Sequence, residues 1–260
     1  MEHFKTNMKN YFSKKIINSY RSKIIFLSFL FFYLTPCLKA QKQVRTTNLA
    51  WYDMIIQFPL NQKWSIYGEY GHRRINMIRD LNQQLFIIGL IRNLNSEVNV
   101  TFGLANFHND INPSYSFKNR PEYRSFQFIK IGKSLGSLQT QFRLRIEQRW
   151  NQESTDSDLL QTFVFNHRVG YRIKAQFPIS NDLYNNTLLF GEIGNETMVN
   201  YGKNVELNTF DQSRLYGGIL VKWSQKCSTH LTLMYLYQQK NNGTDFSEQY
   251  IIRFSQKIVL

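Results

Sequence analysis

The chain has 260 residues, a formal net charge of +14, 15% aromatic residues and only four alanines, which are Ala40, Ala50, Ala105 and Ala175. Alanine favours helices and aromatic residues favour strands, so this composition argues against a helix bundle or a helix-layered α/β enzyme and predicts an all-β fold. Charged residues make up 19% of the chain, too few to keep it unfolded, and the length suits one large domain.

The first element in chain order is a predicted secretory signal peptide over residues 1–40, followed by a single domain over residues 41–260. Its apolar run, Ile24 to Leu34, is eleven residues long and follows a basic stretch. A membrane-spanning helix needs about 20 apolar residues, so this run is typical of a cleaved signal, with cleavage after Ala40. Acylation at Cys37 is the alternative, but the residues before Cys37 match a lipoprotein recognition sequence poorly.

Removal of the signal changes the charge and the cysteine content. Residues 1–40 hold seven Lys or Arg and one Asp or Glu, so the exported chain has a net charge of +8. An exported chain does not normally meet nucleic acid, so we expect no nucleic-acid partner and relate the basic excess to anionic lipids. Cys227 is then the single cysteine, which excludes an internal disulfide.

From residue 47 onward the chain repeats segments in which apolar and polar residues alternate. In the clearest segment, Leu144 and Ile146 fall on one face, while Arg143, Arg145 and Glu147 fall on the other. The alternation predicts eleven strands, at residues 47–58, 64–74, 82–91, 97–107, 121–131, 138–150, 160–176, 184–195, 208–223, 229–239 and 249–260.

Short and longer connections alternate between these strands, which is typical of an antiparallel meander. Most of the strands have the 9–11 residues or so that cross a membrane, so we predict a transmembrane β-barrel in the bacterial outer membrane, with short turns in the periplasm and longer loops outside. Bacterial barrels normally have an even number of strands and both chain ends in the periplasm. Twelve strands are therefore expected, with ten as the alternative.

Aromatic residues near the strand ends are expected to form girdles at the two membrane surfaces. They are Trp51, Phe58, Trp64, Phe107, Trp150, Phe177, Trp223 and Tyr250. In a water-soluble barrel or sandwich, which is the alternative fold, the same residues would belong to the core.

Short acidic, arginine and aromatic motifs recur along this pattern. They include Trp51, Phe58-Pro59-Leu60, Lys63-Trp64-Ser65, Glu69, Arg73, Pro121-Glu122-Tyr123-Arg124, the run 142–150, Glu192 and the run 210–216. Over residues 47–260 the sequence resembles the domain of unknown function 2490 family, a set of predicted outer-membrane proteins. The resemblance implies an outer-membrane β-barrel, and because no activity is established for the family it implies no catalytic residues.

If the apolar faces meet lipid, the opposite faces line the barrel interior, where charges of both signs gather. We expect a charge ladder of Glu69, Arg73, Glu122, Arg124, Arg143, Arg145, Glu147, Arg149, Glu192 and Arg214, joined by Arg168, Arg172 and Arg253. Two interpretations stay open. The ladder fills a narrow barrel through cross-strand ion pairs, or it lines a porin-like pore whose arginine excess favours anions.

No enzyme signature is convincing. Residues 132–136 match G-x-S-x-G, but a hydrolase elbow needs a following helix and a strong strand follows here, so we interpret them as a tight turn. The histidines lack metal-binding spacing, and Glu147 and Glu192 have arginine neighbours that indicate ion pairs rather than acid–base catalysis. We therefore predict no catalytic, cofactor-binding or metal-binding residue.

Three hypotheses follow for function. The preferred one is a non-enzymatic structural or transport-related barrel, with outer-membrane lipids and the barrel-assembly machinery as partners. The second is an outer-membrane lipid hydrolase or acyl-modifying enzyme, for which His108, Asn109 and Asp110 offer a loop site. The third is a soluble periplasmic binding barrel. The sequence identifies no solute or ligand.

Overall fold

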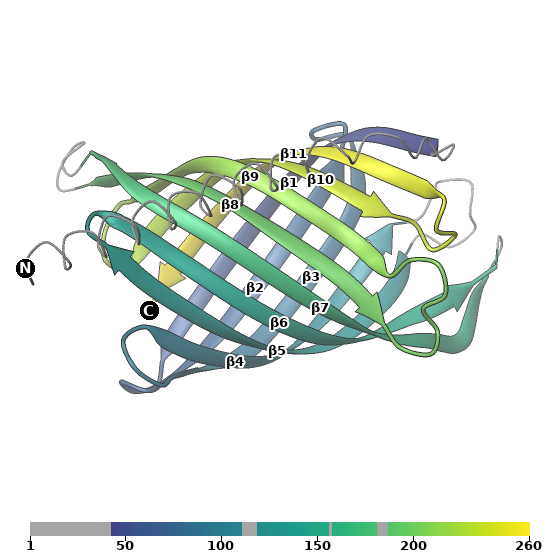
Figure 1. Ribbon diagram of the computed structural model, residues 1–260, viewed down its shortest axis with the longest axis horizontal. Helices are drawn as coiled ribbons and strands as arrows, with labels where there is room; N and C mark the ends of the chain where they lie inside the picture. The colour runs from purple at the N-terminus through teal and green to yellow at the C-terminus, as the bar shows by residue number, and fades with distance from the viewer. Residues whose placement is uncertain (1–42, 111–118, 156–157, 181–186) are drawn as a thin grey trace, which may run out of the picture. The chain divides into compact units, whose positions relative to one another are not determined.

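The computed structural model describes residues 43–110, 119–155, 158–180 and 187–260, and the predicted signal peptide and Cys37 lie outside them. The described residues form eleven strands (Figure 1). These are β1 (Gln43–Pro59), β2 (Trp64–Ile75), β3 (Asp80–Asn93), β4 (Val98–Asp110), β5 (Asn119–Leu135), β6 (Leu138–Ser154), β7 (Leu159–Ser180), β8 (Leu188–Tyr201), β9 (Phe210–Lys222), β10 (Cys227–Gln239) and β11 (Asp245–Val259). No helix in this part of the chain is long and apolar enough to span a membrane.

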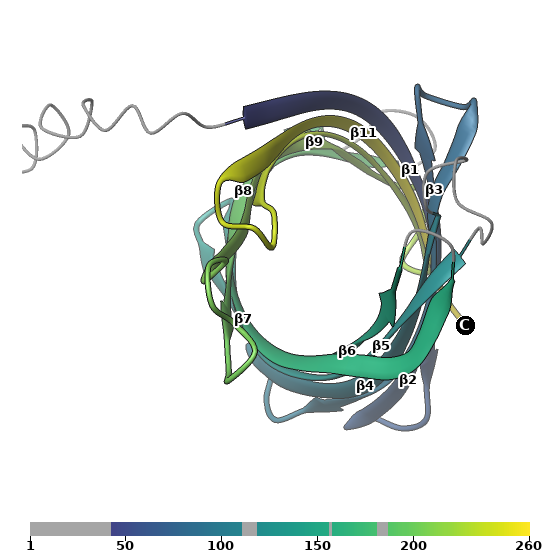
Figure 2. The same cartoon turned by 90° about the vertical axis from the view of Figure 1, so that its right-hand side faces the viewer.

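The strands form one closed barrel in which each pairs with its neighbours in the sequence, as the meander predicted (Figure 2). Twelve strands were expected, but the described residues form eleven. An odd number of strands in a meander leaves the first and last pointing the same way, so the barrel closes through a parallel pair. β1 and β11 make that seam, with Gln43 opposite Asp245 and Gln57 opposite Val259.

The odd count also places the ends of the described chain apart. We call the end that carries the β1–β2, β3–β4, β5–β6, β7–β8 and β9–β10 connections the turn end, and the other the loop end. Leu260 follows β11 at the turn end, whereas Gln43 begins β1 at the loop end. The expectation that both ends of the barrel chain share one side, which applies to even-stranded barrels, does not hold here.

Most strands extend beyond the predicted bounds, because the backbone pairing between neighbouring strands continues past the residues in which apolar and polar side chains alternate. At the loop end Asn109 pairs with Arg120 and Gln152 pairs with Phe163. β8 shows the largest shift, running to Tyr201 instead of residue 195. Of the residues predicted as a tight turn, 132–135 extend β5 and pair with β6. The turn itself lies at residues 136–137, where Gly136 has a φ of 61°, a conformation that suits glycine.

The two faces of the barrel have opposite character. Large apolar side chains are exposed on the outer face of many strands, such as Phe86 and Ile88 on β3 and Phe102 and Leu104 on β4. The inner face holds two buried apolar clusters. One consists of Leu49, Trp51, Tyr216, Met234, Leu236 and Ile251, and the other of Leu85, Ala105, Phe107 and Phe126.

These clusters correct part of the aromatic prediction. Trp51 and Phe107 are only 3% and 4% exposed, so they are interior residues and not members of a surface girdle. The reason is strand parity, since Trp51 alternates with outward-facing Tyr52 and Phe107 lies two residues from inward-facing Ala105. Phe58, Trp150, Phe177, Trp223 and Tyr250 are exposed.

Candidate functional site in the barrel interior

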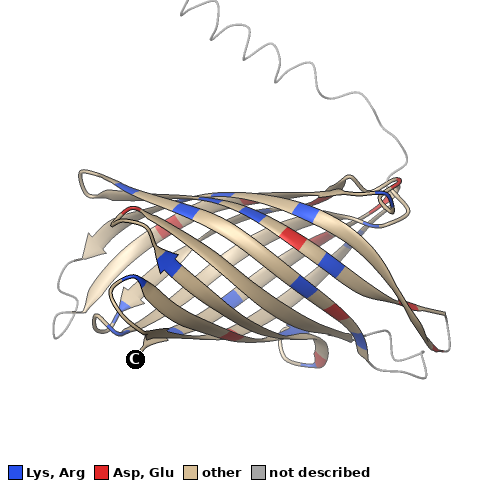
Figure 3. Cartoon of the chain, turned by 90° about the horizontal axis from the view of Figure 1, so that it is seen from below, with Lys and Arg blue, Asp and Glu red and all other residues tan. Residues whose placement is uncertain are grey.

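Charged residues occupy the middle of many strands as well as the connections (Figure 3). The register places them beside one another: on the β6–β7 pair, Glu147 faces Arg168 and Arg143 faces Arg172. Their inward direction follows from the period of two, because the intervening Leu144 and Ile146 are exposed on the outer face. Strand alternation therefore supplies most of the charged interior, and the connections add Glu206 and Lys240 at the loop end.

Glu147 is the centre of this ion-pair network. Its carboxylate is buried, lies 2.7 Å from Arg145 and 3.7 Å from Arg124, and accepts a hydrogen bond of 2.6 Å from Nε of Arg168. Arg168 also donates to Asp211 at 2.7 Å. Burying an unpaired carboxylate costs free energy. The three guanidinium groups around Glu147 offset this cost by pairing with its charge.

Glu122 extends the network toward the loop end. It accepts hydrogen bonds from Arg124 at 2.7 Å and from Arg149 at 2.6 Å, and it is 4% exposed. Arg149 also reaches Asn200 at 3.4 Å. With Asp211 on β9, the network therefore extends from β5 to β9 and ties five strands together.

Further ion pairs join β6 to β8, β8 to β9, and β1 to β11. Glu196 pairs with Arg143 and lies 3.5 Å from Arg214. Asp53 accepts a hydrogen bond from Arg253, 2.5 Å long, across the β1–β11 seam. Arg253 also lies 3.8 Å from Glu69, whose carboxylate accepts a hydrogen bond from Tyr67 at 2.8 Å.

Several interior guanidinium groups also lie over aromatic rings, which stabilises a cation that is shielded from water. Arg73 lies 3.8 Å from the ring centre of Trp51, Arg124 lies 3.7 Å from that of Phe107, and Arg145 lies 4.2 Å from that of Phe126. Arg73 has no carboxylate within 4 Å among the described residues, and its Nη1 donates instead to Gln83 at 2.5 Å.

Two cavities lie inside the barrel. The one toward the turn end has a volume of about 360 Å³, and the one toward the loop end has a volume of about 770 Å³. Trp51, Arg73 and Arg214 line both. The ion pairs of Glu122 with Arg124 and of Arg168 with Asp211 join the lining of one cavity to that of the other, so the network lies between them.

The turn-end cavity is strongly basic. Five of its lining cations form what we call the basic cluster: Lys130, Arg143, Arg172, Lys174 and Lys257. Lys174 lies 3.5 Å from Glu192 and Arg143 pairs with Glu196. The other three have no carboxylate within 4 Å among the described residues. Arg172 donates to the amide oxygen of Gln141 at 2.6 Å.

The structure places the residues of the expected charge ladder as follows. One connected network contains Glu122, Arg124, Arg145, Glu147 and Arg149. Arg143 and Arg214 share Glu196 as their partner. Glu69 and Arg73 lie near the β1–β11 seam. Glu192 stands apart, 3.5 Å from Lys174 and 3.3 Å from His230. Glu147 and Glu192 therefore contact different partners.

Several interior charges lay outside the predicted ladder. They include Asp53, Lys130, Lys174, Glu196, Asp211 and Lys257, and the loop-end cavity adds Arg120, Glu153, Glu206 and Lys240. Glu196 lay one residue beyond the predicted end of its strand, so its face was not assigned. Lys257 lies four residues from Arg253 and so on the same face of its strand, but it was not included in the ladder. Asp53 lies two residues from Trp51, and because Trp51 was expected at the membrane surface, parity gave the wrong face for Asp53.

The loop site suggested by His108, Asn109 and Asp110 is not assembled around its histidine. His108 and Asn109 are adjacent in β4, so their side chains leave opposite faces of the strand. Asn109 accepts from Gln83 and donates to the carbonyl oxygen of Arg120 at 3.3 Å. Among the described residues no group of three His, Cys, Asp or Glu side chains could hold a metal ion.

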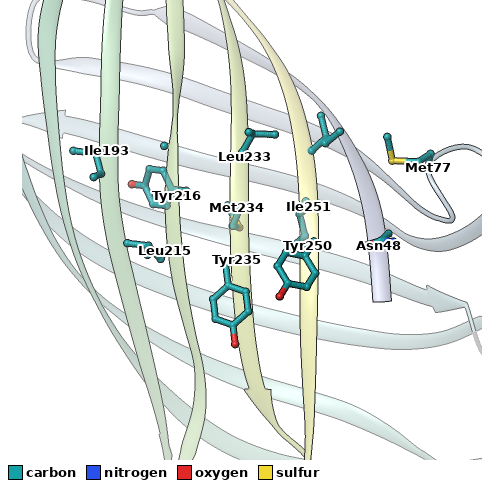
Figure 4. Close-up of a pocket in the computed structure, with 12 residues that line it drawn as sticks. Asn48, Met77, Ile193, Leu215, Tyr216, Leu233, Met234, Tyr235, Tyr250 and Ile251 are labelled. Atoms are coloured by element: carbon teal, nitrogen blue, oxygen red, sulfur yellow. The ribbon is translucent and has the colours of Figure 1, made fainter. Parts of the chain in front are cut away.

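An apolar groove of about 650 Å³ lies on the outer face, across β8 to β11 and the start of β1 (Figure 4). Ile193, Leu215, Leu233 and Tyr250 line it and are each at least half exposed. Gly217 lies between Leu215 and Ile219 on the outer face, where its missing side chain leaves the hollow. The outer surface is therefore apolar, whereas the interior is charged.

Comparison with known proteins adds a family. The model of the family described as Protein of unknown function (DUF2490) matches residues 48–247. The chain belongs to this DUF2490 family. The resemblance found from the sequence motifs is thereby confirmed. No curated protein matches the sequence.

Two solved structures are similar to this DUF2490 protein. LpxR from Salmonella typhimurium matches with a TM-score of 0.46 and 8% identity, over 75% of this chain and 83% of that one. The siderophore receptor PirA from Pseudomonas aeruginosa matches with a TM-score of 0.28 and 12% identity, over 69% of this chain and 32% of that one.

Proposed function

We propose that this protein is an integral β-barrel of the outer membrane that acts as an anion-selective pore. The observation that carries the proposal is the inversion of polarity between the two faces: exposed hydrocarbon outside and buried charge inside. In a water-soluble barrel the apolar face would point inward. A closed barrel leaves no unpaired strand edge, as a lipid environment requires.

The outer face supports the membrane location. Exposed side chains such as Met54, Phe86, Leu104, Ile193 and Leu233 come from strands all around the barrel. Contiguous apolar surface on this scale marks contact with a membrane or a partner, and in water it would drive aggregation. The soluble binding barrel is therefore the weaker hypothesis, and membrane lipids are the proposed surroundings.

The interior supports the anion preference. Among the described residues that line the turn-end cavity, eleven are Lys or Arg and three are Glu. A confined passage with such an excess attracts anions and repels cations. The cavities at its two ends provide polar space on both sides of the ion-pair network.

The test has two stages. In a washed outer-membrane fraction, the unheated protein is expected to migrate differently from the boiled protein on a gel, as a closed barrel does. In planar bilayers under a KCl gradient, the folded protein is expected to give a reversal potential that favours chloride. Recovery from the soluble periplasm would contradict the membrane location. A folded barrel that shows no conductance, or a preference for potassium, would contradict the pore.

A further inference from the structure

The turn-end cavity has two unlike walls. The basic cluster, defined above, extends over β5, β6, β7 and β11. Ile55, Ile87 and Ile91 line the cavity from β1 and β3, and Tyr67 lines it from β2 between them. The register brings the walls together, because Ile55 lies directly opposite Lys257 across the β1–β11 seam. Apolar and cationic side chains therefore face the same space of about 360 Å³.

The protein neutralises the basic wall only in part. Arg143 pairs with Glu196 and Lys174 lies 3.5 Å from Glu192, but Lys130, Arg172 and Lys257 have no carboxylate within 4 Å among the described residues. The buried Nε atoms of Arg143 and Arg172 have no hydrogen-bond partner among the described residues. Like charges confined together destabilise one another, so a counter-anion at this point would stabilise the site.

We propose that the turn-end cavity is a binding site for an amphiphilic oxyanion. Its phosphate or carboxylate group contacts Lys130, Arg172 and Lys257, and its hydrocarbon part lies against Ile55, Ile87 and Ile91. Guanidinium groups match the geometry of such oxyanions and hold them through charge-assisted hydrogen bonds. The cavity volume lies in the range of small-molecule sites and suits a short hydrocarbon chain.

This inference rests on the proposed function in one respect: the cavity is the interior of a barrel that opens to solutes. The same chemistry, an anionic head on an alkyl chain, could come from a soluble metabolite or from a membrane lipid. Hexyl phosphate represents the soluble source, and dioleoyl phosphatidic acid in vesicles represents the lipid source. Competition by either one identifies which source reaches the cavity.

Calorimetric titration of the folded full-length barrel in non-ionic detergent tests the site. Hexyl phosphate is expected to bind more tightly than inorganic phosphate, and hexanol is expected not to bind detectably. The double variant Lys130→Gln with Lys257→Gln should lower the affinity for hexyl phosphate at least about tenfold, because two charge-assisted contacts are lost. Neither lysine leaves a buried carboxylate behind.

Two controls separate the site from general charge and from folding. Lys63→Gln with Lys226→Gln removes two exposed lysines at the same end of the barrel and should leave the affinity unchanged. Ile91→Ser should weaken hexyl phosphate binding several-fold while leaving inorganic phosphate binding unchanged, because it alters the apolar wall alone. Heat-modifiable gel mobility verifies that every variant is folded.

Equal affinity in the wild type and the Lys130, Lys257 double variant would overturn the proposal, and so would the absence of hexyl phosphate binding by a folded barrel. Either result leaves the chloride selectivity of the pore as a separate measurement. Conversely, hexyl phosphate binding by a barrel without conductance would support the site and contradict the pore.

Discussion

The two halves of the barrel interior differ in how their charge is balanced. Among the described residues, the turn-end cavity is lined by eleven Lys or Arg and three Glu, whereas the loop-end cavity is lined by five Lys or Arg and four Asp or Glu. The loop-end lining also holds thirteen Asn or Gln, against two in the turn-end lining. The same strand alternation made both halves polar, but most of the uncompensated charge lies in the turn-end half. Selectivity should therefore depend on the turn end, and stability on the network between the halves.

The largest expected effect is a reversal of ion selectivity. Lys130→Glu with Lys257→Glu changes the charge of the turn-end cavity by four units and should move the reversal potential toward cation preference. Because exposed fields are screened by salt, the shift should grow as the ionic strength falls. The measurement is the reversal potential in planar bilayers at two mean KCl concentrations.

A substitution in the other half, which changes the charge by two units, sharpens this prediction. Lys240→Glu changes a lining residue of the loop-end cavity, where the charges are nearly balanced, and should shift the reversal potential much less. If Lys240→Glu shifts it by half as much as the turn-end double variant or more, the two halves do not differ in the way proposed.

The next effect concerns stability. Glu147→Ala removes the carboxylate shared by Arg124, Arg145 and Arg168 and leaves buried guanidinium groups without their partner. Breaking a buried ion pair from one side costs about 3–5 kcal/mol of unfolding free energy. Urea titration of the folded barrel, followed by gel mobility, measures the change. Glu206→Ala, at an exposed loop-end residue, is the control and should cost less than about 0.5 kcal/mol. Similar losses in the two variants would contradict a central role for the network.

Much of the fold could be predicted because alternation carries it directly. Period two alone separates Leu144 and Ile146 from Arg143, Arg145 and Glu147, and in the structure the first two are exposed on the outer face while the other three line the turn-end cavity. Alternation does not determine whether the barrel closes with an odd or an even number of strands. Closure depends on the parallel pairing of β1 with β11, which lie at the two ends of the barrel chain. Aromatic residues misled the analysis at Trp51 and Phe107, since residue type does not reveal which face meets lipid.

The site was harder to predict than the fold. Alternation gave the inward direction of the arginines but not their partners, because those are set by the register between strands. Glu196 and Asp211 pair with Arg143 and Arg168 across sequence separations of 53 and 43 residues. The basic cluster was missed because Lys130, Lys174 and Lys257 lie singly on three strands and meet only in the closed barrel.

The smallest effect compares one substitution in both halves. Gln141, at the turn end, accepts a hydrogen bond of 2.6 Å from Arg172, and Gln152, at the loop end, donates one of 2.7 Å to the carbonyl oxygen of Leu160 in an exposed setting. Gln141→Ala leaves a guanidinium group in an already cationic region and should cost about 1–2 kcal/mol, whereas Gln152→Ala should cost less than about 0.5 kcal/mol because water replaces the lost partner. Urea titration of both variants under identical conditions gives the difference. Equal costs would mean that solvent reaches the two ends of the interior equally, and the basic cluster would then be a hydrated surface and not a site that requires an anion.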